Sequence, residues 1–154
     1  LRARGERLLS WSLLARAYLF LGVLEAAAAL VVFFFVLDAT GWQYGETLAR
    51  LDPTYLQATT ACLATIVMMQ VVNVFLCRHP LKSSLSFGLF SNPLILLGIA
   101  AEIGLLLFIV YTPAGIWLFG TAPIGPQVWL LAICFAVLMW VLEEVRKAWL
   151  RGIL

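Results

Sequence analysis

Four apolar segments, each long enough to cross a membrane, constrain this chain more than any other feature of its sequence. The hydrocarbon layer of a bilayer is about 30 Å thick, and a helix needs roughly 20 residues to cross it. The segments cover residues 13–37, 58–77, 92–111 and 127–142, and each is rich in Leu, Ile, Val and Phe. The sequence therefore predicts an all-α membrane protein whose four transmembrane helices form a single domain over residues 1–154.

The composition agrees with this fold class. Hydrophobic residues make up 64% of the chain and charged residues only 12%, which is more apolar than a soluble surface tolerates. The first apolar segment carries too many charges for a cleaved signal peptide, so we expect it to be a permanent span. The net charge of +2 gives no reason to expect a nucleic acid partner, and the expected surroundings are the lipid bilayer.

The basic residues predict which way the helices run. If the four predicted spans cross the membrane in turn, nine of the ten Lys and Arg residues fall on one side of it, with Arg16 at the start of the first span. Only Arg50 falls on the other side. Because Lys and Arg gather in short cytoplasmic loops, we expect both termini and the loop at residues 78–91 to be cytoplasmic. The nine residues are Arg2, Arg4, Arg7, Arg16, Arg78, Lys82, Arg146, Lys147 and Arg151.

Two outer connections, residues 38–57 and 112–126, have Gly and Pro punctuation and too little apolar periodicity for a folded catalytic unit. We interpret the first as a loop with room for one short interfacial helix. The second carries Trp117 and Phe119, which suits a connection that lies against the lipid headgroups. We therefore expect neither catalytic residues nor a cofactor site in this chain.

Four polar side chains inside the predicted spans are the candidate functional residues: Glu25, Gln70, Asn73 and Glu102. An ionisable side chain at bilayer depth costs several kcal/mol unless it is paired or faces water, which makes it a functional candidate. At about 1.5 Å per helical residue, both glutamates fall near the middle of their predicted spans. The two amides stand three residues apart, so they lie one turn apart on one helix.

Helical spacing puts these residues on three stripes that we expect to turn inward. In one interpretation the amides are hydrogen-bond glue between helices and the glutamates are protonated. In the other they line a cation site, because hard cations prefer carboxylate and amide oxygens. Gln70 and Asn73 would then face Glu102, with Glu25 as a further candidate. The stripes are Tyr18, Gly22, Glu25 and Ala29; Ile66, Gln70, Asn73 and Cys77; and Gly98 with Glu102.

Five segments carry a family resemblance: "ERLLSW", "AYLFLGVLEA", "TTACLATIVMMQVVNVFLCR", "FSNPLILLGIAAEIGLLLFIVYTP" and "LEEVRKAWLR". In order, spacing and topology they resemble the last four transmembrane helices of the type II P-type cation ATPases, the branch that holds the sodium/potassium, proton/potassium and calcium pumps. The resemblance covers nearly the whole chain. It implies the C-terminal part of an ATP-driven cation pump, a membrane support domain that packs against the transport helices and hydrolyses nothing alone.

The same resemblance implies peripheral cation ligands. In sodium pumps the second of these helices carries Gln-x-x-Asp and the third a Glu, and these side chains contribute to a third sodium site. Gln70 matches the Gln, Asn73 stands at the Asp position, and Glu102 matches the Glu. Asn73 removes one negative charge from that site. Val67 stands where calcium pumps of the sarcoplasmic reticulum type carry a ligating Glu, which counts against a two-calcium site of that design.

Cofactors and further domains are implied outside this chain. The sequence has neither a Gly-rich nucleotide loop nor an Asp-Lys-Thr-Gly phosphorylation motif. ATP and Mg²⁺ would therefore bind elsewhere in the parent pump, whose other transmembrane and cytoplasmic domains are the expected partners. We expect this pump in the plasma membrane.

An obligatory β subunit is not expected. Sodium/potassium pumps dock that subunit on a long outer loop through a Ser-Tyr-Gly-Gln-like segment, and the short 38–57 loop offers only "WQYGE". Two alternatives to a pump domain stay open. One is a self-standing four-helix scaffold or assembly factor, and the other is a small ion or proton channel formed by oligomerisation around Glu25 and Glu102.

Overall fold

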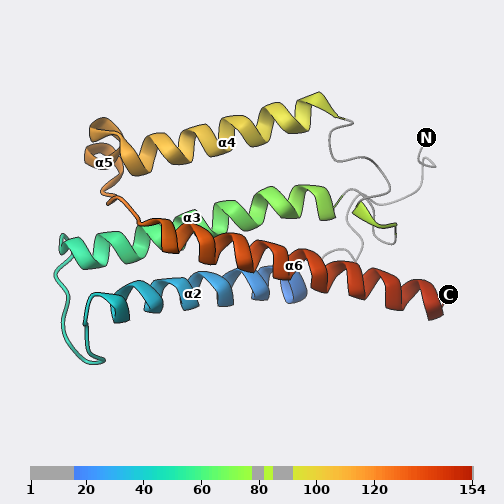
Figure 1. Ribbon diagram of the computed structural model, residues 1–154, viewed down its shortest axis with the longest axis horizontal. Coiled ribbons are helices and arrows are strands. Elements are labelled where there is room, and N and C mark those ends of the chain that lie inside the picture. Colours follow the sequence, from blue (N-terminus) through green and yellow to red (C-terminus); the bar gives the residue numbers. More distant parts are fainter. Residues whose placement is uncertain (1–15, 78–81, 85–91, 154) are drawn as a thin grey trace.

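The computed structural model describes residues 16–77, 82–84 and 92–153 (Figure 1). Within these ranges there is no strand, so the predicted all-α class is confirmed. The elements in chain order are η1 (Arg16–Leu21, a π-helical turn), α2 (Gly22–Ala39), α3 (Pro53–Leu76), α4 (Pro93–Tyr111), α5 (Pro113–Phe119) and α6 (Pro126–Ile153).

Proline sets the start of α3, α4, α5 and α6. Proline suits the first helical turn, because its fixed φ is helical and its missing N–H has no intrahelical partner there. The residue before it caps the helix in three cases. Asp52 Oδ1 accepts from the Thr54 amide at 2.8 Å, Asn92 Oδ1 from the Leu94 amide at 3.0 Å, and Thr112 Oγ1 from the Gly115 amide at 3.0 Å.

Within the described ranges, four helices are long and apolar enough to span a membrane, as many as the sequence predicts. They cover Leu19–Ala39, Pro53–Leu76, Pro93–Tyr111 and Pro126–Gly152. Two are longer than the apolar segments suggested. The first turn of α3 begins at Pro53 because Asp52 caps it there. The last turns of α6 continue beyond Leu142 through a run of charged residues whose side chains pair with one another.

The helices run alternately up and down, so η1 and the last turns of α6 lie at one end of the bundle, called here the η1 end (Figure 1). The opposite end, called the α5 end, holds the turn between α2 and α3 and the short helix α5. This arrangement agrees with the predicted topology of four crossings.

The packed core lies between α2, α3 and α6, while α4 stands apart and touches mainly α3 and α5 (Figure 1). Small side chains let α3 approach its neighbours closely, since Ala58, Ala61 and Ala64 have no exposed surface. They belong to a larger apolar cluster towards the α5 end. A second cluster towards the η1 end consists of Leu21, Ala28, Met69, Leu76, Ala136 and Met139.

At the α5 end, hydrogen bonds fasten α4 to the connection that leads into α6. Tyr111 Oη donates to the Ile124 carbonyl at 2.9 Å and accepts from Trp129 Nε1 at 2.6 Å. The predicted connection at 112–126 thus contains a short helix, α5, which the sequence reading left out. Its tight start needs Gly115, because a Cβ atom there would clash with the Phe108 carbonyl oxygen.

At the η1 end, a cluster called here the clasp joins α3, residues 82–84 and α6. Lys147 of α6 has no exposed surface. Its Nζ donates to the Leu76 carbonyl at 3.2 Å and lies 3.3 Å from Glu144 Oε1. The same Glu144 oxygen accepts from the Ser84 amide at 3.0 Å and from Ser84 Oγ at 2.9 Å, and Trp140 Nε1 donates to Ser84 Oγ at 2.9 Å. The clasp therefore fixes the end of α3 against α6.

Candidate functional site

Two amides of α3 hold one carboxylate of α2. Gln70 Nε2 donates to Glu25 Oε2 at 2.7 Å, and Asn73 Nδ2 donates to Glu25 Oε1 at 3.2 Å. Asn73 Oδ1 in turn accepts from Cys77 Sγ at 3.1 Å. The group of Glu25, Gln70 and Asn73 is called here the triad. Each of its members is half-buried in this chain.

Helical spacing explains why the two amides act together. Gln70 and Asn73 stand three residues apart, so both side chains leave α3 on the same face, one turn above the other. That separation lets each amide reach a different oxygen of Glu25. The carboxylate therefore receives one donor on each oxygen, both from neutral groups.

The triad lies towards the η1 end. Glu25 follows Leu19, the start of the first candidate span, by six residues, and Gln70 precedes Leu76, the end of α3, by six residues. At about 1.5 Å per residue, each lies about 9 Å along its helix from that end. Glu25 is therefore closer to the end of its candidate span than the sequence analysis expected. The equal depths also bring Glu25 level with Gln70.

Glu102 stays apart from the triad within the described residues. It lies near the middle of α4 and is half-buried. The described residues give it no hydrogen bond, and both amides donate to Glu25 instead. The sequence analysis expected Gln70 and Asn73 to face Glu102, but in the structure both amides bond to Glu25.

The triad offers the oxygens of one ionisable carboxylate and two neutral amides. No basic side chain among the described residues bonds to Glu25, and its two donors are neutral amides. A buried ionised carboxylate needs a compensating charge or a proton. Those same ranges hold no cluster of three or more His, Cys, Asp or Glu side chains close enough together to bind one metal ion.

The sequence analysis named all three residues as candidates but did not predict that the two amides bond to Glu25. Depth along the helices could have indicated the pairing. Helices α2 and α3 follow one another in the chain, joined by the turn at residues 40–52, and consecutive elements are usually neighbours. Counting back from that turn puts Glu25 and Gln70 at similar heights. The stripes alone did not identify the partner helix, since a stripe that faces inward can meet any of several neighbouring helices.

The chain is similar to known proteins over nearly its whole length. Residues 1–149 match the family model described as cation transporting ATPase, C-terminus. The potassium-transporting ATPase alpha chain 2 of Homo sapiens is 27% identical over 170 aligned residues, which cover 95% of this chain and 16% of that protein. Its counterpart in Cavia porcellus is 28% identical over 172 residues, covering 96% of this chain and 17% of that protein.

A bacterial relative matches a shorter stretch. The probable cation-transporting ATPase F of Mycobacterium bovis is 37% identical over 73 residues, which cover 47% of this chain and 8% of that protein. The chain thus spans 16% to 17% of the length of the potassium-transporting relatives.

Proposed function

Because this chain belongs to the family of cation-transporting ATPase C-termini, we propose that it works as the membrane support domain of an ATP-driven cation pump. The single observation that carries this proposal is the family match over residues 1–149. The match favours a pump domain over the self-standing scaffold and the small channel. ATP and Mg²⁺ would act on other domains of that pump, and this chain would pack against its transport helices.

The triad is the part of this domain proposed to contribute to cation handling. Its carboxylate sits in the apolar layer with two neutral donors, so its charge must be balanced by a bound cation or by a proton. Glu25 oxygens would serve as cation ligands, and rotation of the Gln70 or Asn73 amide would add a carbonyl oxygen. Exchange between a proton and a cation at Glu25 is then the elementary event of the site.

Glu102 is proposed as a second, separate contributor. It lies on α4, which is the least buried of the four spans in this chain. A half-buried glutamate near the middle of a span is costly towards lipid. The other transmembrane helices of the pump would therefore cover this side of α4 and share Glu102 as a ligand or hydrogen-bond partner.

The positions of the Lys and Arg residues support one orientation of this domain in the membrane. Five of the six described basic residues belong to segments at the η1 end, and the sixth, Arg50, lies between α2 and α3. The five are Arg16 of η1, Lys82 beside the clasp, and Arg146, Lys147 and Arg151 in the last turns of α6. The η1 end would then be cytoplasmic by the positive-inside rule. The pump would reside in the plasma membrane, in contact with lipid and without an obligatory β subunit.

The test is cation activation of ATP hydrolysis by the full-length pump. Glu25→Gln and Glu102→Gln should each raise the cation concentration for half-maximal activity by about five-fold or change its dependence on pH. Val67→Ala is the matched control, because Val67 lies on the same helix as the amides but packs in the apolar cluster towards the α5 end. It should shift activation by less than about two-fold. If both glutamine variants activate normally and lose only thermal stability, the triad is hydrogen-bond glue.

A further inference from the structure

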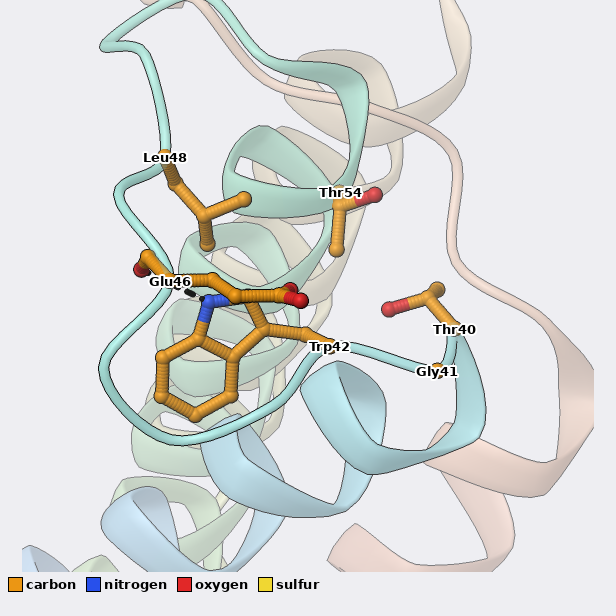
Figure 2. A pocket seen from close by; sticks show the side chains of 6 residues that line it. All are labelled: Thr40, Gly41, Trp42, Glu46, Leu48 and Thr54. Atoms are coloured by element: carbon orange, nitrogen blue, oxygen red, sulfur yellow. Dashed lines mark hydrogen bonds between the residues drawn. The ribbon is translucent and has the colours of Figure 1, made fainter.

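A hollow at the α5 end is formed by residues that belong neither to the triad nor to the clasp. It has a volume of about 160 Å³ and opens beside the turn that joins α2 to α3 (Figure 2). This is several times the roughly 30 Å³ that a water molecule occupies in the liquid. Its walls are Thr40, Gly41, Trp42, Glu46, Leu48 and Thr54. In Figure 2, Trp42, Glu46 and Leu48 lie on one side of it and the two threonines on the other.

The hollow is built by specific contacts. Gly41 has a positive φ of 83°, a conformation that glycine adopts at little cost, and it turns the chain directly after α2. Trp42 is held at both ends, since its backbone amide donates to the Leu37 carbonyl at 3.1 Å and its Nε1 donates to the Glu46 carbonyl at 3.0 Å. Trp42 and Leu48 also pack against the apolar core. The walls are therefore anchored to the bundle.

The Glu46 carboxylate is the only charged group among the six lining residues. Its Oε2 accepts from the backbone amide of Gln43 at 3.1 Å, and this bond holds the Glu46 side chain in place. The surrounding segment, residues 38–57, carries Asp38, Glu46 and Asp52 against Arg50 alone, a net charge of −2. This end of the molecule therefore attracts cations.

The wall chemistry selects an organic cation over a metal ion. One carboxylate with an indole and two hydroxyl groups offers few of the six or more oxygen ligands that Ca²⁺ takes. An alkylammonium group, by contrast, is attracted by a carboxylate and by the face of a Trp ring. Hydroxyl oxygens accept its N–H donors.

The position of the hollow indicates where such a group comes from. It lies where α2 ends and α3 begins, at the edge of the apolar layer, which is the level of lipid headgroups. Two large side chains of the same turn, Tyr44 and Leu51, are 94% and 78% exposed. Exposed apolar groups of this kind suit contact with lipid. We propose that this hollow binds the ammonium headgroup of a phospholipid such as phosphatidylethanolamine.

Native mass spectrometry of the full-length protein, with defined lipids added to the detergent, tests this binding. Phosphatidylethanolamine should bind about five-fold less tightly to Glu46→Gln than to the unchanged protein. Asp38→Asn is the matched control, since it removes the same charge from the adjoining end of α2, at an exposed residue outside the hollow. It should stay within about two-fold of the unchanged protein. Equal binding by the unchanged protein and Glu46→Gln would overturn the proposal.

Changes in the lipid keep the test decisive if Glu46→Gln folds poorly. Phosphatidylglycerol and N-acetylated phosphatidylethanolamine lack the positive charge, so both should bind the unchanged protein more weakly than phosphatidylethanolamine with the same acyl chains. Equal binding of all three lipids would overturn an ammonium site. Free ethanolamine should compete only weakly, and competition as strong as that of the lipid would overturn the lipid assignment.

Discussion

Gln70 and Glu25, 45 positions apart in the sequence, meet between α3 and α2 at 2.7 Å. With Asn73 on the second oxygen, this bond leaves the carboxylate with one donor per oxygen and no positive partner among the described residues. The bond is therefore both a packing contact and the place where charge compensation is needed.

The first prediction concerns the strength of this bond. A double-mutant cycle of Gln70→Leu and Glu25→Leu should give a coupling free energy of about 0.5–2 kcal/mol, the range for interhelical hydrogen bonds in membranes. Thermal unfolding of the full-length protein in detergent measures it. Gln43→Leu, in the exposed turn, is the control for Gln70→Leu and should show no coupling with Glu25→Leu. A coupling of zero for the first pair would mean that the bond adds nothing to stability.

The second prediction concerns the clasp. Lys147→Met should destabilise the protein by an amount towards the lower end of the about 3–5 kcal/mol expected when one partner of a buried ion pair is removed. The lower end is expected because Glu144 keeps its two donors from Ser84. Arg151→Met, on an exposed residue of the same helix, should change the unfolding temperature little. Similar losses in both variants would show that net charge, and not the clasp, governs stability.

The third prediction concerns the start of α5. Gly115→Ala should destabilise the protein by about 1–3 kcal/mol, the usual cost of forcing extra volume into a packed site. The new Cβ atom would meet the Phe108 carbonyl oxygen and lie 2.8 Å from Ile109 Cα, so the backbone must move. Gly104→Ala, with open space around it in this chain, is the control and should be neutral or favourable. Circular dichroism during heating compares the two variants.

The fourth prediction concerns orientation. In a background without native cysteines, Arg151→Cys should react with an impermeant thiol reagent only from the cytoplasmic side, and Tyr44→Cys only from outside. Both positions are exposed, so reactivity reports sidedness and not burial. Sealed inside-out and right-side-out vesicles provide the two sides. The reverse pattern would contradict the proposed orientation.

Much of the fold could be read from the sequence because its signals are local. Apolar length gives the spans, and the dipeptides Asp52-Pro53, Asn92-Pro93 and Thr112-Pro113 mark where helices begin. The continuation of α6 beyond Leu142 could also be predicted. Glu143 with Arg146 and Glu144 with Lys147 stand three residues apart, so their opposite charges can pair on the surface of a helix.

The pairing within the candidate site could not be read in the same way. Which glutamate meets Gln70 depends on which helix packs beside α3, and that choice is made by small residues such as Ala58, Ala61 and Ala64 across several helices at once. A stripe gives the direction of a side chain but not its partner. The hollow beside Trp42 was equally hidden, because it arises from how a turn folds back on two helix ends.

The proline starts have a consequence for how this domain meets membranes of different thickness. Because α3, α4 and α6 each begin at a proline, the chain fixes their first residues, and the helices cannot lengthen at that end to follow the lipid. Helix α4, with 19 residues, is about 29 Å long, close to the thickness of the hydrocarbon layer, whereas α6, with 28 residues, is about 42 Å long. The extra length of α6 lies in the charged turns beyond Leu142, which belong outside the hydrocarbon layer. In a thicker bilayer the lipid must therefore draw inwards around α4. Local thinning of the bilayer is therefore expected beside α4.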